Sequence, residues 1–349
     1  MQRKKRIGIL TGGGDCPGLN AAIRATAKTA FQMGYDVIGI RNGWTGFIEN
    51  EIKVLDGNNT SGIIDKGGTI LGTSRMSPFQ IENGPQRVFD GFEKLGLEAL
   101  VVLGGEGTLS CASRLFKMGL PVVGIPKTID NDVKETDYTI GFQTAVQIAT
   151  EALDRLRSTA ESHHRVMLLE VMGRQAGWIA TYAGMANGAD AILIPEIPLD
   201  KEKLAELCHM LKERNRRGTT FSVVVVAEGT ALEGKIISRR SFNIAEPEKA
   251  YLLGGIGNAL GKIIEKRTRL ETRVSSLDYI QRGGTPVAYD RSLATAFGVK
   301  AAELIKEKKC GEMTALKGNR ITSVPLEKVA DGIKTVNLNV YRIAAIFFG

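Results

Sequence analysis

The sequence feature that most restricts the fold is a short apolar run, residues 121–125, which is followed at once by charged and hydroxyl side chains. The run is uninterrupted and rich in β-branched residues, which predicts a buried strand of a parallel sheet. Ligands in open α/β sheets bind at the carboxyl ends of such strands. Asp130 and Asp132 fall at that end, so one is placed to accept a proton while the other holds a metal or orients a neighbour, and Thr128 adds a hydroxyl. An Asx-rich turn that closes a strand explains the same residues equally well.

Two glycine-rich loops follow other predicted strands. Residues 6–10 predict a strand, residues 11–20 a loop and residues 21–33 a helix, and the same order recurs in residues 99–103, 104–108 and a helix that ends near residue 118. Glycines let main-chain amides approach a phosphate closely, and the helix N-terminus adds partial positive charge. The first loop has neither GxxxxGK[ST] nor GxGxxG spacing, so a plain βα turn remains an alternative for it. The second loop carries Glu106, a carboxylate suited to a phosphate-bound Mg²⁺.

The rest of the chain continues the alternation of strands and helices. Further strands are predicted at residues 36–40, 165–171, 191–195 and 221–227, and further helices at residues 141–157, 200–216 and 252–266. The stretch that follows residue 40 is expected to be irregular. The second half therefore resembles the first, and the fold class is α/β. Arginines stand in loops and at strand ends, namely Arg75, Arg174, Arg273 and Arg282. Their guanidinium groups match phosphate oxygens, which favours a phosphorylated ligand.

Composition narrows the classes of function. A length of 349 residues predicts two domains. The net charge of +8 suits nucleic acid, anionic membranes or phosphorylated small molecules. The basic residues are dispersed among acidic ones without interleaved aromatics, so the small molecule is favoured over nucleic acid. The four cysteines form no CxxC pair and the three histidines show no ligand spacing, which indicates a reduced cytoplasmic protein without structural zinc. We find no signal-peptide pattern and no apolar run long enough for a membrane span.

Five separated motifs resemble those of the 6-phosphofructokinase family. They are residues 13–20 (GGDCPGLN), 104–108 (GGEGT), 126–132 (PKTIDND), 171–174 (VMGR) and 280–284 (IQRGG), within a resemblance that extends from about residue 6 to 310. The resemblance implies two similar Rossmann-like three-layer domains with the active site in the cleft between them. It assigns residues 1–141 plus 281–331 to a phosphoryl-donor domain, and residues 142–280 plus 332–349 to a sugar-phosphate domain.

The resemblance also implies a role for each site residue. Asp130 would be the general base on the 1-hydroxyl of fructose 6-phosphate, supported by Thr128 and Asp132, and Glu106 would hold Mg²⁺. The donor side would comprise Gly14, Arg75, Glu106, Gly107, Thr108 and Lys127. The sugar would contact Met172, Gly173, Arg174 and Glu228, with Arg174 also stabilising charge in transfer. The 6-phosphate would be bound by Arg165, Arg273 and Arg282, beside Tyr279. Phosphoryl transfer requires alignment, metal, cationic groups and a base, and these residues supply each part.

Several residues depart from the usual family pattern. Glu106 stands where Asp is common, so the metal carboxylate is one methylene longer and can reach Mg²⁺ through water. Tyr279 stands where the bacterial ATP enzymes usually have His, which replaces an imidazole by a phenol.

The residues at positions 107 and 127 give opposite indications of the phosphoryl donor. Gly107 leaves room for the α-phosphate and nucleoside of ATP, whereas the pyrophosphate-dependent members usually have Asp there. Lys127 is typical of the pyrophosphate-dependent members. We give Gly107 more weight, because the larger donor needs the missing side chain, while a lysine serves the phosphates of either donor. We therefore predict ATP with Mg²⁺ as the donor and keep pyrophosphate as the alternative.

The expected assembly is a homotetramer or homodimer in the cytoplasm, with Arg165 and Arg273 reaching across an interface. Two other classes of function stay open. An NAD or lipid kinase has a GGEGT-like loop but no use for residues 281–284 or for the arginines. A non-catalytic nucleotide-binding or nucleic-acid-binding protein has no use for the carboxylates.

Overall fold

The computed structural model describes residues 5–236, 238–240, 251–330 and 332–349. The chain forms two compact units: unit 1 comprises Met1–Thr144 and Arg282–Lys334, and unit 2 comprises Ala145–Gln281 and Thr335–Gly349. The chain thus passes from one unit to the other three times. Parts of the domains expected from the sequence, residues 1–4, 237, 241–250 and 331, lie outside the described residues.

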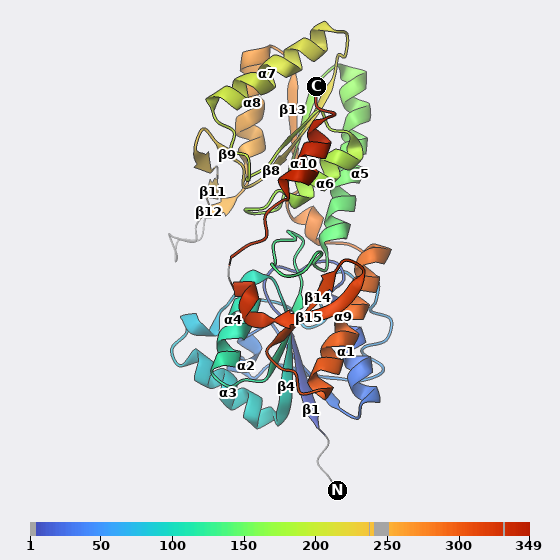
Figure 1. Cartoon of the computed structure of the whole chain (residues 1–349), viewed down its shortest axis with the longest axis vertical. Helices are drawn as coiled ribbons and strands as arrows, with labels where there is room; N and C mark the ends of the chain where they lie inside the picture. Colours follow the sequence, from blue (N-terminus) through green and yellow to red (C-terminus); the bar gives the residue numbers. More distant parts are fainter. Residues whose placement is uncertain (1–4, 237, 241–250, 331) are drawn as a thin grey trace. The chain divides into compact units, whose positions relative to one another are not determined.

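Unit 1 is built on a seven-stranded sheet with the strand order β15-β14-β5-β4-β1-β2-β3 (Figure 1). The strands are β1 (Arg6–Thr11), β2 (Asp36–Ile40), β3 (Ile52–Leu55), β4 (Leu97–Gly104), β5 (Val122–Pro126), β14 (Glu312–Lys317) and β15 (Arg320–Pro325). The five central strands are parallel, and only β3 and β15, at the two edges, run antiparallel to their neighbours. From β1 the chain continues to β2 on one side and later to β4 on the other side. The topological switch point therefore lies between β1 and β4.

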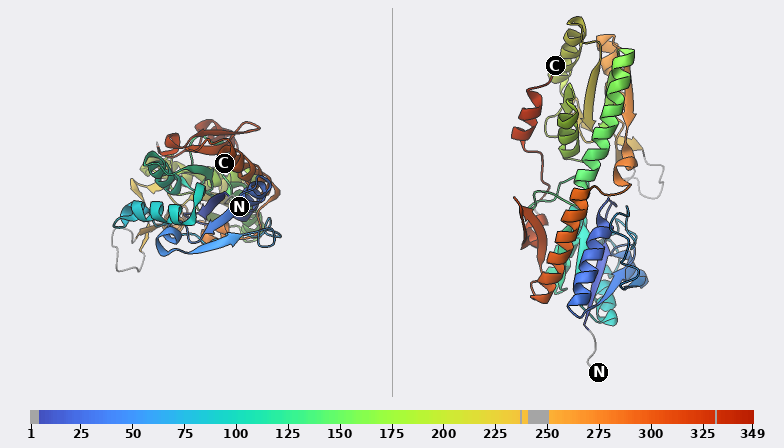
Figure 2. Two further views of the ribbon diagram at one scale, coloured as in Figure 1. Left: turned by 90° about the horizontal axis from the view of Figure 1, so that it is seen from below. Right: turned by 90° about the vertical axis from the view of Figure 1, so that its right-hand side faces the viewer.

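Helices pack against this sheet. They are α1 (Leu19–Gln32), α2 (Thr45–Glu49), α3 (Gly84–Leu95), α4 (Glu106–Lys117) and α9 (Ala288–Lys306), with short 3₁₀ turns at Pro78–Gln80 and Leu326–Ala330. Buried side chains of β4 and α4, among them Leu100, Val102 and Leu115, form part of the core. Helices α1 and α9 lie side by side (Figure 2). Their close approach requires Gly298, because a Cβ atom there would lie 2.7 Å from the carbonyl oxygen of Ala22.

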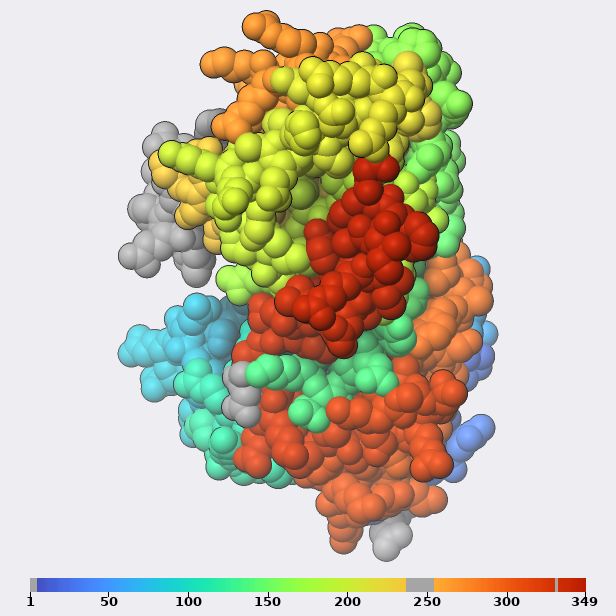
Figure 3. Space-filling model, turned by 45° about the horizontal axis from the view of Figure 1, so that its top comes forward, coloured from blue at the N-terminus to red at the C-terminus, as the bar shows by residue number. Residues whose placement is uncertain are grey.

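Unit 2 contains a smaller, wholly parallel sheet with the order β13-β6-β8-β7. Its elements are α5 (Phe142–His163, which starts in unit 1), β6 (Val166–Val171), α6 (Trp178–Asn187), β7 (Ala191–Leu193), α7 (Lys201–Arg216), β8 (Ser222–Ala227), α8 (Ile256–Thr268), β13 (Thr272–Ser276) and α10 (Leu338–Ala345). Two small strand pairs, β9 (Ala231–Leu232) with β10 (Lys235–Ile236) and β11 (Ser238–Arg240) with β12 (Tyr251–Leu253), complete it, and the 3₁₀ turn Asp278–Arg282 leads back to unit 1. Helix α10 lies on the surface of unit 2 (Figure 3), where the Tyr341 hydroxyl donates to the carbonyl of Ile192 at 2.9 Å.

Most predicted strands and helices are confirmed to within a few residues, and the α/β class is confirmed. Two predictions of local structure were wrong. The segment after β2, which we expected to be irregular, contains α2 and the edge strand β3. The helix predicted at residues 252–266 begins only at Ile256, because Gly254 and Gly255 have φ values of 123° and 93°, which no right-handed helix contains. No helix of the described residues has both the length and the apolar character that a membrane span requires.

The N-terminus of α5 is closed by a carboxylate from another helix. Asp290, in the first turn of α9, is buried and accepts hydrogen bonds from Gly141 N at 2.9 Å, Thr144 N at 2.8 Å and Thr144 Oγ1 at 2.6 Å. Burial raises the pKa of the Asp290 carboxyl, and the bonds from Thr144 and Gly141 oppose that rise. A carboxylate in this position satisfies main-chain N–H groups that a helix leaves without partners and offsets its dipole.

We therefore expect Asp290→Ala to lower the free energy of unfolding by about 3 kcal/mol or more, because three buried donors lose their acceptor. Asp290→Asn keeps one acceptor oxygen and costs less. The matched control is Asp90→Ala on α3, where the exposed carboxylate accepts a hydrogen bond from Gln86, and the expected change is within ~0.5 kcal/mol. Urea unfolding, monitored by circular dichroism, measures the stability of the three variants. Equal losses for Asp290→Ala and Asp90→Ala would refute the capping role of Asp290.

Candidate active site

Three loops meet at the carboxyl edge of the unit 1 sheet, at its switch point. They follow β1, β4 and β5, and main-chain bonds join them: Gly12 N donates to Leu103 O at 2.9 Å, and Lys127 N donates to Gly104 O at 2.9 Å. A fourth segment joins the first loop, since Gly13 N donates to Ser74 O at 2.8 Å. Parallel pairing of the three strands therefore brings the two glycine loops and the PKTIDND segment into one place.

Lys127 is buried beneath the first glycine loop. Its side chain is 1% exposed, and Nζ donates to the carbonyl oxygens of Gly12 and Gly14, each at 2.7 Å. Burial lowers the pKa of Lys127 to about 8. We expected this side chain to bind donor phosphates, and in the structure it fixes the conformation of the loop that precedes α1.

The second glycine loop places Glu106, Gly107 and Thr108 in the first turn of α4. Thr108 packs so closely on the neighbouring loops that a Cβ atom at Gly12 would lie 2.7 Å from its side chain, and one at Gly104 would lie 2.4 Å from it. At Gly107, by contrast, an added Cβ atom would meet nothing within 4 Å. Position 107 is therefore open space, whereas Gly12 and Gly104 are required by packing.

The carboxylates of the third loop are held in a fixed turn. Asp130 and Asp132 are 2% and 7% exposed, and Asn131 between them has φ of 51°. Asn131 Oδ1 accepts a hydrogen bond from Thr139 N at 3.1 Å, and Thr139 Oγ1 donates to the carbonyl of Thr128 at 2.6 Å. Asp130 N donates to Thr128 Oγ1 at 3.2 Å.

Two arginines stand near the first glycine loop. Thr73 Oγ1 donates to Gly13 O at 2.6 Å, which places the exposed Arg75 two residues further along the same segment. Arg282 is buried, and its Nη1 donates to Asp15 O at 3.3 Å. Although the resemblance assigns Arg282 to the sugar 6-phosphate, its side chain lies on the first glycine loop, and a Cβ atom at Gly14 would lie 2.5 Å from Nη1.

The expected sugar contacts gather at the carboxyl ends of β6 and β8 in unit 2. Arg174 N donates to Glu228 Oε1 at 3.1 Å, and Glu228 N donates to Val171 O at 2.9 Å. Met172 N donates to the buried Gln281 Oε1 at 2.7 Å. The structure thus brings Met172, Gly173, Arg174 and Glu228 together.

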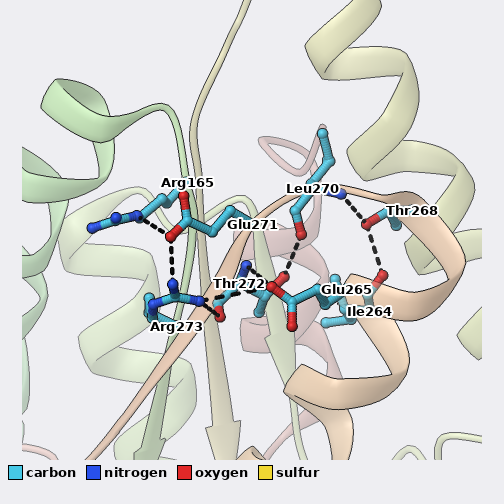
Figure 4. Close-up of polar contacts among 8 residues, drawn as sticks. All are labelled: Arg165, Ile264, Glu265, Thr268, Leu270, Glu271, Thr272 and Arg273. Carbon is cyan, nitrogen blue, oxygen red and sulfur yellow. Dashed lines mark hydrogen bonds and ion pairs between the residues drawn. The ribbon is translucent and has the colours of Figure 1, made fainter.

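Arg165 and Arg273 lie at the other end of the same sheet (Figure 4). Arg165 precedes β6, and Arg273 is the second residue of β13. Both bind Glu271: Arg165 Nε lies 2.9 Å and Arg273 Nη2 lies 2.5 Å from Oε1. The hydrogen bond from Arg165 lowers the pKa of the Glu271 carboxyl. Since β6 has six residues, about 20 Å separates these arginines from Met172 and Arg174. Tyr279, by contrast, is 64% exposed to solvent.

The donor loops fit a Mg²⁺ that is bound mainly through phosphate. Among the residues the structure describes, no three His, Cys, Asp or Glu side chains gather as a ligand set. Mg²⁺ in phosphoryl-transfer sites keeps several waters and uses one or two protein carboxylates together with substrate phosphates. Glu106, in the second glycine loop and the first turn of α4, is a carboxylate of that kind.

Two contributors to the third loop escaped the sequence analysis. Thr139 carries no motif, and Lys334, which also binds Asn131, lies about two hundred residues further along the chain. Neither has a local sequence signal, because each acts through contacts that only the folded chain creates.

A family model and curated relatives match this chain over most of its length. The family model described as phosphofructokinase matches residues 6–305. The chain is 48% identical to the ATP-dependent 6-phosphofructokinase of Spirochaeta thermophila, over 95% of this chain and 93% of that protein. It is 47% identical to the pyrophosphate–fructose 6-phosphate 1-phosphotransferase of Streptomyces coelicolor, over 99% of this chain and 100% of that protein.

Solved structures agree with this family. The phosphofructokinase of Saccharomyces cerevisiae matches with a TM-score of 0.82 at 30% identity, over 99% of this chain and 46% of that chain, so the present chain spans about half of the yeast protein. The pyrophosphate-dependent phosphofructokinase of Marinobacter aquaeolei matches with a TM-score of 0.81 at 25% identity, over 96% of this chain and 86% of that chain. The chain belongs to the phosphofructokinase family.

Proposed function

We propose that this chain transfers the γ-phosphoryl group of ATP, with Mg²⁺, to the 1-hydroxyl of D-fructose 6-phosphate, which gives fructose 1,6-bisphosphate and ADP. The observation that carries the proposal is the buried Asp130, which follows β5 at the carboxyl edge of a parallel sheet, next to the glycine loops that follow β4 and β1. The open space at Gly107 favours ATP over pyrophosphate. Pyrophosphate remains the alternative, because relatives of nearly equal identity are named for either donor.

The two units divide the work in this proposal. Unit 1 binds the donor through the loops that follow β1 and β4, and Glu106 holds Mg²⁺, which when bound neutralises phosphate charge. Unit 2 binds the sugar through Met172, Gly173, Arg174 and Glu228. Asp130 accepts the proton of the 1-hydroxyl while the hydroxyl oxygen attacks the γ-phosphorus. The bond between that phosphorus and the leaving ADP oxygen breaks. Thr128 and Asp132 hold Asp130 and the hydroxyl in line, and Arg174 balances the charge of the transferring group.

The assembly we propose is a homotetramer or homodimer that works in the cytoplasm without nucleic acid. Its support is the position of Arg165 and Arg273 at the end of the unit 2 sheet opposite to the sugar contacts. Within one chain the two groups are too far apart to bind one sugar phosphate, so we infer that these arginines serve the site of a neighbouring subunit.

The donor is tested by an assay of fructose 1,6-bisphosphate formation with ATP and with pyrophosphate. We expect a higher kcat/KM with ATP, and we expect Gly107→Asp to cut ATP use by a hundredfold or more, because a carboxylate ~4 Å from a phosphate costs several kcal/mol. The fold should tolerate the new side chain, since nothing lies within 4 Å of the added Cβ. Gly57→Asp, at another open and exposed glycine, is the matched control and should leave both donors unaffected.

A higher kcat/KM of the unaltered protein with pyrophosphate would reverse the donor assignment. No product with either donor would reject the proposed function itself.

The base is tested by Asp130→Ser. Loss of a general base lowers kcat by ~10²–10⁴, and we expect a loss in this range with a much smaller change in KM for fructose 6-phosphate. Steady-state kinetics over a range of sugar concentrations separate the two parameters. A near-normal kcat would show that another group takes the proton.

The shared site is tested by hybrids of two inactive variants, Asp130→Ser and Arg273→Ala. If Arg273 serves a neighbour, a mixed pair contains one site with both residues intact, and random mixing restores about a quarter of the sites in a symmetric assembly. Co-expression with two affinity tags gives the hybrids, and each variant refolded alone is the control. Hybrids no more active than the two parents together would place Arg273 in the site of its own chain or in none.

A further inference from the structure

The end of unit 1 returns to the loop that carries the candidate base. Lys334 is the last residue of unit 1 and lies beyond residues 6–305, which the family model matches. Ile333 pairs with Val133 in an antiparallel bridge, and Lys334 N donates to Asp132 O at 2.8 Å. The main chain at residues 333–334 thus runs along the residues that follow Asp130.

The side chain of Lys334 makes three further bonds to the same loop. Its Nζ donates to Asn131 Oδ1 at 3.1 Å, to Thr136 O at 2.7 Å and to Asp137 O at 2.8 Å. An ammonium group has three N–H donors, and here three acceptors meet them. Both ends of the loop turn, residues 131 and 136–137, are therefore joined by one cation.

The charges around Lys334 keep it a cation at neutral pH. Burial lowers its pKa to about 8, the carboxylates of Asp137 and Asp132 oppose the fall, and Lys317 adds to it. Lys317 is itself paired with Glu135 at 3.2 Å. Below about pH 8 the third N–H is present, and the neutral amine that forms above it can donate only two of these three bonds.

Lys334 and its three bonds to this loop, which we call the clamp, affect the site through Asn131. With φ of 51° Asn131 occupies the left-handed region, which asparagine adopts more readily than other non-glycine residues but which still costs energy. Its Oδ1 accepts from Lys334 Nζ and from Thr139 N, so the amide is held from two sides. Because Asn131 stands between Asp130 and Asp132, its turn sets the direction in which both carboxylates leave the main chain.

We propose that Lys334 is a positioning residue of the phosphoryl-transfer site, and that it orients Asp130 and Asp132 by clamping Asn131 and the carbonyls of residues 136–137. The proposal rests on the proposed function, because it takes Asp130 as the base. Misplacement of a reacting group by about 1 Å costs on the order of 10²-fold in rate, so the contribution of a clamp of this kind is measurable.

The experiment compares Lys334→Met and the milder Lys334→Gln with the unaltered full chain. We expect Lys334→Met to lower kcat by about 10- to 100-fold while KM for fructose 6-phosphate and for the donor stays within about threefold. Lys334→Gln, which keeps two N–H donors on a shorter side chain, should lose less. Lys317→Met is the matched control: its lysine also contacts this loop, through Glu135, but lies half-exposed, and kcat should not change.

A double-mutant cycle with Asn131→Gly gives the second readout. Glycine accepts the positive φ and removes the side-chain amide, which binds Lys334 and also Thr139 and Asp137. If Lys334 acts through Asn131, adding Lys334→Met to Asn131→Gly lowers kcat by no more than about threefold further, whereas independent effects multiply. Thermal unfolding of each variant shows whether the fold is retained.

Three results would overturn the proposal: an unchanged kcat in Lys334→Met and Lys334→Gln, a rise in both KM values in step with a lower Tm, or multiplicative losses in the cycle. Failure of the proposed function is distinct, because the unaltered chain would then form no fructose 1,6-bisphosphate or Asp130→Ser would retain near-normal kcat.

Discussion

The constraint on which the site depends is the parallel pairing of β1, β4 and β5. Parallel strands end at the same edge of a sheet, so loops more than a hundred residues apart in the sequence become neighbours. The reversal of strand order between β1 and β4 opens the crevice in which α/β sheets bind ligands. Gly12 and Gly104 then allow Thr108 to pack closely against both loops, whereas an added Cβ atom at Gly107 would meet nothing within 4 Å.

Two lysines, the buried Lys127 and the partly buried Lys334, fix the loops that this pairing assembles. Lys127 binds the carbonyls of Gly12 and Gly14, and Lys334 binds those of residues 136–137, and burial lowers the pKa of each to about 8. Between this value and the ordinary lysine pKa the unfolded chain binds more protons than the folded one, so the contribution of both groups to stability rises with pH from about 8 to about 10.5. At neutral pH each buried charge therefore costs stability. The protein retains the charges where they order the loops of the site, which is typical of functional positions.

The parts of the structure that the sequence predicted are those with a local signal. Residues 121–125 and 99–103 are apolar and β-branched throughout, which marks buried parallel strands, and glycines mark the loops that follow them. The hairpin of β14 and β15, the cap of α5 by Asp290 and the clamp by Lys334 have no such signal. Each joins segments whose partners are fixed only by tertiary structure; Asp290, for example, lies 146 residues from Thr144. The grouping of Arg165 with Arg273 through Glu271 is likewise a product of strand register, which periodicity alone does not give.

The contacts of Lys127 also bear on the two opposite indications of the donor. A lysine that is characteristic of pyrophosphate-dependent relatives would argue for pyrophosphate if its ammonium were directed at the phosphates. Here both short bonds of Nζ go to main-chain carbonyls of the first glycine loop, so the side chain acts as an internal brace that serves either donor equally. In the proposed function the donor is then discriminated at position 107, where an added Cβ atom would meet nothing within 4 Å. In the proposed function the loop that Lys127 supports binds the phosphates that ATP and pyrophosphate have in common, so a lysine at position 127 is compatible with a nucleotide donor.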